Sequence, residues 1–318
     1  MSPSRPSRRW PRRTLFVAGG SVVAAATLAT WERSRGGAPW NPAALGYPDG
    51  DTLTVTTSDG AELAVTVAGP SDGPTVVLAH CWMGSRAIWG PVADRLVRAG
   101  HRVVLYDQRG HGSSTKGDRE LSVAMLGDDL HSVLQSVNAR DAVLAGHSMG
   151  GMTVQSYANE HPVDFKERTS AVVLVSTAAR VAGRARPARS NRGGEPRNAP
   201  RWSSQGLLGY GTSRLAFGRL PRRSDVELTQ HGLITTPTAI RDGFMAAMAT
   251  MDLRPVLGSI DVPTTVLVGT RDLLTPPRLA RGLAEGIPSA QLVVLPGIGH
   301  MVPLEAPDAV VGAIAPTG

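Results

Sequence analysis

Apolar residues recur along this chain in short blocks, which predicts strands and helices that alternate. Two segments, 52–57 and 62–67, alternate apolar and polar residues around Ser58-Asp59-Gly60, a pattern typical of a hairpin. Continuous apolar blocks predict strands at 75–80, 102–107, 141–147, 170–176, 264–270 and 290–295. Helical spacing predicts helices at 87–99, 121–137, 150–160, 276–286 and 304–314. This order predicts an α/β fold with a doubly wound, mostly parallel sheet.

The alternation is interrupted over residues 179–259, between two predicted strands. We expect an inserted helical cap there, with core segments at 51–178 and 260–318. Its first part, Arg180 to Arg201, is rich in Arg, Pro and Gly and poor in apolar residues, so we expect it to be mobile. Its second part predicts a helix near 237–251.

Length and composition agree with one large domain plus an insertion, since 318 residues with 42% hydrophobic content can bury a sizeable core. The single cysteine, Cys81, excludes an intramolecular disulfide. No Cys/His cluster has the spacing of metal ligands, and the glycine-rich Gly146–Gly151 lacks the lysine of a phosphate-binding loop. The sequence therefore predicts no metal and no cofactor.

The net charge of +7 is concentrated in two tracts. Residues 1–40 hold seven arginines against Glu32, and residues 180–201 hold seven arginines against Glu195, so each tract has a net charge of +6. The remaining residues therefore carry a net charge of −5. This distribution favours a targeting segment and a solvated loop over a nucleic-acid-binding face.

The first tract has the layout of an export signal. Arg12-Arg13 precedes an uncharged stretch, Thr14 to Thr30, which is rich in Ala, Val and Gly and is followed by Glu32-Arg33. The arginine pairs resemble a twin-arginine signal. As a helix the stretch would span about 25 Å, short of a bilayer core of about 30 Å, yet an uncleaved membrane anchor stays open. We expect residues 1–30 to be the export signal or membrane anchor of an exported protein, secreted or anchored, and residues 31–50 to be a linker.

The most informative motif is Gly146-His147-Ser148-Met149-Gly150, which lies between a predicted strand and a predicted helix. A G-x-S-x-G sequence in this position is typical of a nucleophile elbow, in which a sharp turn exposes the serine hydroxyl. Free amides at the start of the helix can stabilise an anion beside that serine. The motif predicts that Ser148 is a nucleophile.

A nucleophilic serine needs a base and an acid that orients the base. Two later strands end in such residues: segment 264–270 leads to Asp272, and segment 290–295 leads to His300. The predicted strand 170–176 leads to no carboxylate, so it is a weaker candidate for the position of the acid. His231 has no strand before it, so it is a weaker candidate for the base. We therefore predict a Ser148–Asp272–His300 triad.

The oxyanion that forms during acyl transfer needs backbone N–H donors. One candidate is Met149, directly after the nucleophile, and the other is Trp82, in the loop after the strand 75–80. We expect His80 to brace that loop and Cys81 to be a small filler, not a catalytic thiol.

The quoted motifs together resemble the α/β-hydrolase fold superfamily, in its group of capped serine hydrolases. The matching segments, in the expected order over about residues 50–318, are 80–85 (HCWMGS), 107–113 (DQRGHGS), 146–151, 268–272 (VGTRD) and 299–305 (GHMVPLE). The group includes esterases, monoacylglycerol lipases, cofactor-free haloperoxidases and carbon–carbon bond hydrolases. Cys81 stands where these proteins usually have glycine, so its side chain is expected to narrow either the oxyanion loop or the mouth of the pocket.

The resemblance implies a serine esterase for a small-molecule ester with a modest-sized, largely apolar acyl group. Peracid formation and carbon–carbon bond cleavage stay open at the same site, and a non-catalytic binding protein is the remote alternative. A serine at the elbow argues against epoxide hydrolases and haloalkane dehalogenases, which need a carboxylate there. The predicted substrate contacts are Cys81, Met245, Met248 and Met301. Met245, Met248 and Met251 have helical spacing, which fits either a packed cap helix or an adaptable acyl pocket.

Overall fold

The computed structural model describes residues 41, 46–181 and 206–315. The predicted export segment (1–30), most of the predicted linker (31–50) and most of the arginine-rich tract (180–201) lie outside these residues. None of the helices in the described part is long and apolar enough to cross a membrane.

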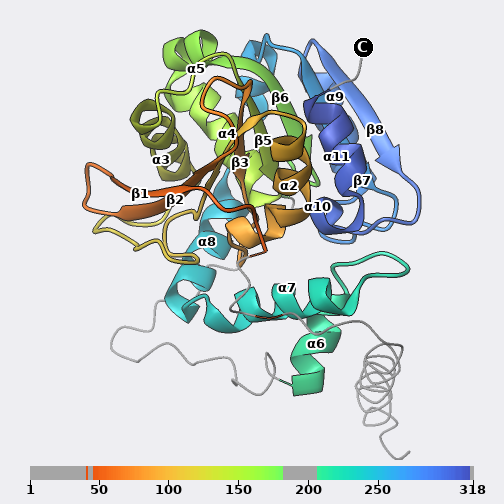
Figure 1. Ribbon diagram of the computed structural model, residues 1–318. Helices are drawn as coiled ribbons and strands as arrows, with labels where there is room; N and C mark the ends of the chain where they lie inside the picture. The colour runs from red at the N-terminus through yellow and green to blue at the C-terminus, as the bar shows by residue number, and fades with distance from the viewer. Residues whose placement is uncertain (1–40, 42–45, 182–205, 316–318) are drawn as a thin grey trace, which may run out of the picture.

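Eight strands form one mixed sheet (Figure 1). They are β1 (Asp51–Thr56), β2 (Glu62–Ala68), β3 (Thr75–Ala79), β4 (Arg102–Tyr106), β5 (Ala142–His147), β6 (Thr169–Val175), β7 (Thr264–Gly269) and β8 (Ala290–Leu295). Their order is β1-β2-β4-β3-β5-β6-β7-β8; β2 pairs antiparallel with β1 and β4, and every other pair is parallel. The predicted mostly parallel sheet is confirmed.

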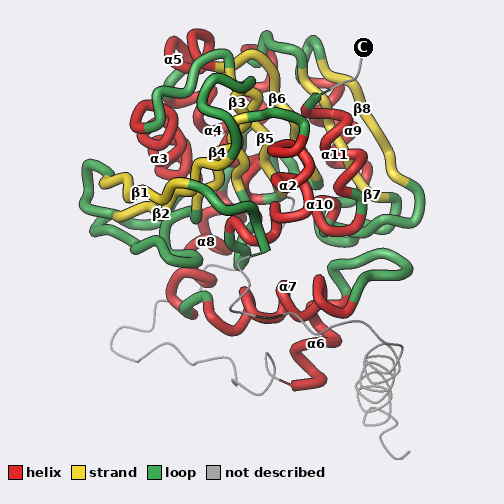
Figure 2. The backbone as a smooth tube through the Cα atoms, in the orientation of Figure 1, coloured by secondary structure: helices red, strands yellow, loops and turns green. Residues whose placement is uncertain are grey.

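Helices cover both faces of this sheet (Figures 1 and 2). In the core they are α2 (Gly90–Arg98), α3 (Val123–Ser136), α4 (Met149–Glu160), α5 (Pro162–Arg168), α9 (Pro277–Gly286), α10 (Val302–Glu305) and α11 (Pro307–Ile314). The described residues also form two 3-10 helices. η1 (Arg86–Trp89) directly precedes α2, and η3 (Arg254–Ser259) lies between α8 and β7.

Successive strand residues point to opposite faces and thereby build two apolar layers. In β3, Val77 joins the cluster formed with α3, α4, α5 and α9, whereas Val76 and Leu78 join the cluster formed with α2, α10 and α11. Both faces of β3 and β4 are therefore buried, which explains why these strands are continuously apolar in the sequence.

The insert between β6 and β7 is helical, as predicted, and lies at one end of the core (Figure 1). It contains α6 (Gly206–Arg214), α7 (Arg223–Thr235) and α8 (Thr238–Thr250). The predicted cap helix near 237–251 corresponds to α8. We refer to these three helices and their connections as the cap.

Two helix predictions need correction. Helix α5 was not expected, because this seven-residue helix buries only Phe165 and so shows no apolar period. The helix expected at 304–314 is two helices, separated at Ala306. Pro307 has no backbone N–H for a continuous helix and instead begins α11.

Candidate active site

Ser148 lies at the turn between β5 and α4, with a φ of 54°, and is half-buried. Its amide donates to Val175 O (2.9 Å) and its carbonyl accepts from Thr177 Oγ1 (2.6 Å), so neighbouring β6 and the loop after it hold the turn. A Cβ on Gly146 would come within 2.3 Å of Gly150 O, so a side chain does not fit there. The strained serine and the close chain approach are those of the predicted nucleophile elbow.

Asp272 and His300 meet at the carboxyl ends of β7 and β8. His300 Nδ1 lies 3.0 Å from Asp272 Oδ2 and 3.1 Å from Oδ1. Oδ1 also accepts from the amide of Thr275 (2.8 Å), and Oδ2 accepts from Thr275 Oγ1 (2.8 Å). The carboxylate is thus fixed in orientation and its pairing with the imidazole is geometrically defined.

Burial raises the pKa of Asp272, but His300 and the hydrogen bonds from Thr275 outweigh this effect. The net result is a pKa below the ordinary value of an aspartate. Asp272 is therefore ionised at neutral pH and accepts the Nδ1 proton of His300.

His147 is a residue whose role the sequence did not reveal. Its Nε2 lies 2.8 Å from the backbone carbonyl oxygen of His300, and the two rings lie 5.0 Å apart. Since a carbonyl can only accept, Nε2 must carry the proton. Burial, with His300 nearby, lowers the pKa of His147 to about 3, so the ring is neutral. His147 thus connects the strand that ends at Ser148 to the loop that holds His300.

The expected oxyanion amides belong to Trp82 and Met149. Within the described part of the chain, neither of these two N–H groups has a hydrogen-bond acceptor. The loop is braced by buried His80: Gln108 N donates to its Nε2 (2.8 Å), so Nδ1 carries the proton and donates to Cys81 O (2.7 Å). His80 therefore has the bracing role expected from the sequence.

Cys81 is buried, with 6% of its surface exposed. Its Sγ would lie 2.9 Å from a Cβ on Gly84, so the thiol packs over that glycine. Burial raises the pKa of Cys81 to about 12. The thiol is protonated at neutral pH and is a poor nucleophile.

The predicted substrate contacts separate in the structure. Met248 is buried in a cluster that we call the cap cluster, together with Met149 and Met152 of α4 and Ile240 and Phe244 of α8. Trp82 packs against this cluster. Trp82 and Met149, the two expected oxyanion donors, therefore border an apolar surface that cap and core share.

The other two methionines lie apart from the cap cluster. Met245 is on α8 but is 48% exposed. Met301 is buried in the other apolar layer, with α2 and α11. Met245 directly follows Phe244 and therefore lies off the face of α8 that buries Phe244 and Met248, and Met301 follows His300 in the core.

Two cap contacts reach the loops of the site. Ala216 O accepts from the amide of His300 (2.7 Å). A Cβ on Gly232 of α7 would come within 1.9 Å of Met83 O, next to Trp82, so α7 rests directly on that loop. His231, the weaker candidate for the base, lies on the same helix of the cap. The cap therefore contacts both the loop of the predicted base and the loop of the predicted oxyanion donor.

No group of three or more His, Cys, Asp or Glu residues with the arrangement of a metal site occurs among residues 46–181 and 206–315.

Acid is expected to destabilise this protein through three buried neutral histidines. Burial lowers the pKa of His80 to about 4 and the pKa values of His111 and His147 to about 3. In the unfolded chain a histidine has a pKa of about 6.5, so below that pH the unfolded state binds protons that the folded state does not. The free energy of unfolding should fall by roughly 2 kcal/mol per histidine between pH 6.5 and 5.

Urea unfolding at neutral pH and at about pH 5 measures this loss. His147→Gln should lose about 2 kcal/mol less than the wild type over the same interval, because it has one such histidine fewer. An identical pH dependence in the two proteins would contradict the neutral state of His147.

The comparisons with known proteins agree with this architecture. The family model described as "alpha/beta hydrolase fold" matches residues 74–307. The chain is 27% identical over 264 residues to a bifunctional esterase/perhydrolase from Acinetobacter calcoaceticus, which covers 78% of this chain and 93% of that protein. It is 29% identical over 267 residues to a non-heme chloroperoxidase from Kitasatospora aureofaciens, with 78% and 93% covered.

Among solved structures, a thermophilic esterase from Thermogutta terrifontis superposes with a TM-score of 0.68 at 26% identity, covering 83% of this chain and 96% of that one. The family model spans more than half of the chain, and its matched region includes the turn at Ser148 and the loops of Asp272 and His300. The chain therefore belongs to the α/β-hydrolase fold family and is a hydrolase of that family.

Proposed function

We propose that this protein is a serine esterase that hydrolyses carboxylic esters of modest-sized, largely apolar acyl groups through an acyl-enzyme. The observation that carries the proposal is the Asp272–His300 pair, held by Thr275, at the same sheet edge as the strained turn of Ser148. An ionised aspartate, an imidazole and a turn serine are the parts that serine acyl transfer needs.

In the proposed reaction, Ser148 Oγ attacks the ester carbonyl while His300 Nε2 takes its proton. Asp272 accepts the Nδ1 proton of His300, which keeps Nε2 free as the base and stabilises the imidazolium. The imidazolium then protonates the leaving alcohol. Water, deprotonated by His300, releases the acid from Ser148.

The amides of Trp82 and Met149 are proposed to donate to the oxyanion. Both lack an acceptor in the described structure and both belong to residues next to the expected reaction centre. Two fixed backbone donors need no reorganisation when the negative charge develops.

The cap cluster supports an apolar acyl group. The cap residues Phe244 and Met248 share this cluster with Met149, and Trp82 packs against it. Apolar side chains therefore lie beside the residues whose amides are the proposed oxyanion donors. Methionine side chains adapt to ligands of different shape, so we expect tolerance among short and medium acyl chains.

A series of p-nitrophenyl esters of increasing acyl length tests this function, with fluorophosphonate labelling to count reactive serines. We expect hydrolysis that peaks at a short or medium chain. A protein that labels at Ser148 but hydrolyses no ester in the series would refute the esterase proposal and leave another reaction of the same serine.

Peracid formation is the second candidate, because one relative is a bifunctional esterase/perhydrolase and another is a chloroperoxidase. The acyl-enzyme would then be opened by hydrogen peroxide in place of water. Halogenation of a dye in the presence of a short acid, halide and peroxide would distinguish it, and should be lost with Ser148→Ala.

We further propose that His147 is a positioning residue for His300. His147→Phe leaves the His300 carbonyl without its donor, and we expect kcat to fall by about ten- to a hundredfold with KM nearly unchanged. His147→Gln, whose amide nitrogen can reach the same carbonyl, should recover most of the kcat. Steady-state kinetics of the two folded variants test this, and equal kcat values for Phe and Gln would rule out the positioning role.

A further inference from the structure

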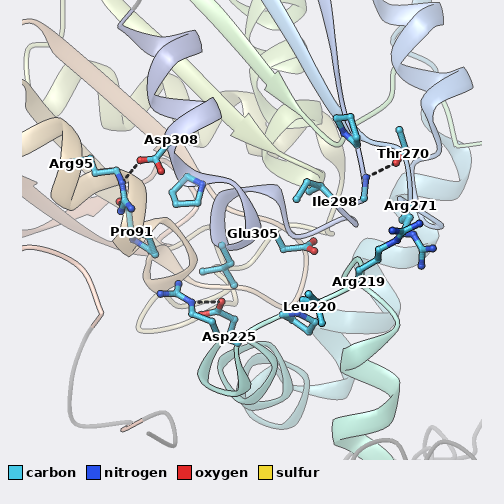
Figure 3. Close-up of a pocket in the computed structure, with 16 residues that line it drawn as sticks. Pro91, Arg95, Arg219, Leu220, Asp225, Thr270, Arg271, Ile298, Glu305 and Asp308 are labelled. Carbon is cyan, nitrogen blue, oxygen red and sulfur yellow. Dashed lines mark hydrogen bonds and ion pairs between the residues drawn. The ribbon is translucent and has the colours of Figure 1, made fainter. Parts of the chain in front are cut away.

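A surface cavity of about 770 Å³ lies between the cap and the core (Figure 3). Residues 296–298, in the loop between β8 and His300, form part of its wall. We call it the arginine cavity, because Arg95, Arg219, Arg222 and Arg271 line it. Ser148, Asp272 and His300 do not line it, so it is distinct from the proposed esterase site.

The carboxylates in the wall of this cavity already have partners. Asp308 Oδ1 accepts from Arg95 Nε (2.6 Å), and Asp225 Oδ2 accepts from Arg222 Nε (2.9 Å). Glu305, the third acid, accepts from the amides of Gly218 (2.6 Å) and Gly299 (3.0 Å). Arg95 and Arg222 are therefore neutralised, and Glu305 is turned toward the backbone.

The side chains of Arg219 and Arg271 have no hydrogen-bond or ion-pair partner among the described residues. Their backbones bind one loop at adjacent positions: Arg219 N donates to Gly297 O (3.2 Å), and Arg271 N donates to Ile298 O (2.9 Å). Figure 3 draws both side chains at the same end of the cavity. Two segments that are far apart in the sequence thus place two arginines, without a side-chain partner among the described residues, in the lining of one cavity.

We propose that the arginine cavity binds a small organic anion, with a phosphate or carboxylate group between Arg219 and Arg271. Guanidinium groups match the oxygens of these anions in bidentate geometry. A bound anion would also relieve the repulsion between the two cations. The cavity volume lies in the range of small-molecule sites and exceeds what a single phosphate would fill, so the rest of the ligand has room beside Leu220 and Ile298.

Such a ligand would bridge two parts of the molecule. Arg219 belongs to the connection between α6 and α7 in the cap, whereas Arg271 directly precedes Asp272 in the core. The loop that both backbones bind continues through Gly299 into His300. Binding should therefore stabilise the docked cap as well as the protein as a whole.

Calorimetric titration with glycerol 3-phosphate and, separately, with glutarate tests the proposal at constant ionic strength. Neither probe is a carboxylic ester, so the result does not depend on the esterase proposal, and Ser148→Ala should bind the probes as the wild type does. We expect saturable binding to the wild type and a loss of at least about tenfold in affinity in the double variant Arg219→Gln/Arg271→Gln.

Arg281→Gln is the matched control, since Arg281 is an exposed arginine of α9 that does not line the cavity. It removes the same charge and should bind both probes with wild-type affinity. Circular dichroism of the variants shows that they are folded. The proposal is overturned if neither probe binds the wild type at about 10 mM, or if the double variant and the control bind equally. Binding to phosphatidylglycerol vesicles without binding to either soluble probe would also overturn it, in favour of a lipid surface.

Discussion

Replacement of Ser148 by alanine is expected to abolish labelling by fluorophosphonate and to lower ester hydrolysis by roughly 10⁴-fold or more. The hydroxyl is the only protein group in the proposed mechanism that forms a bond to the acyl carbon, so no neighbouring residue can replace it. Its position at φ 54° between β5 and α4 is held by backbone contacts that an alanine keeps. The variant should therefore fold and lose only its chemistry.

Ser156 provides a matched control on the same helix. It is buried in α4, and its Oγ has no hydrogen-bond partner in the described structure. Ser156→Ala removes the same atom and should keep both labelling and activity. Wild-type hydrolysis by Ser148→Ala would refute the nucleophile assignment, whereas a wild-type protein without labelling or activity would favour a non-catalytic binding protein.

The strands were predictable from the sequence because they are buried on both faces. In β3 the consecutive residues Val76, Val77 and Leu78 are all buried, and a continuous apolar run of this kind is typical of a strand in a covered parallel sheet. The cap helices were harder to predict. Helix α7 buries only Asp225 and Val226, so it lacks the periodic apolar face that identifies a helix from sequence.

The candidate site was predictable as far as its residues follow strands. Ser148, Asp272 and His300 each lie just beyond a strand of a parallel sheet, and parallel strands bring such ends to one edge. The contact of His147 was not predictable, because its partner is a backbone carbonyl 153 residues away. The same holds for the arginine cavity, which depends on how the cap meets the loop at 297–298.

Asp272→Asn should lower kcat/KM by about 10⁴-fold while the protein stays folded, as the equivalent change does in serine proteases. The amide of Thr275 donates to Oδ1, so the asparagine oxygen should remain there and its NH₂ should replace Oδ2. That NH₂ would donate to His300 Nδ1, where the carboxylate had accepted. The imidazole proton would then move to Nε2, and His300 could no longer take the proton of Ser148.

A second aspartate–histidine pair of this protein offers the control. Asp164 Oδ2 lies 2.7 Å from His131 Nδ1, between α5 and α3, and also accepts from Tyr157 OH, whereas Asp164 Oδ1 accepts from Arg168 Nε. Asp164→Asn changes the same chemical group beside a histidine that the proposed reaction does not use, so it should affect stability and leave kcat/KM near the wild-type value. Hydrolysis by Asp272→Asn within about tenfold of the wild type would show that another acid orients His300. A loss in both variants would instead trace the effect to the fold, because Asp272 contacts the proposed base and Asp164 contacts His131.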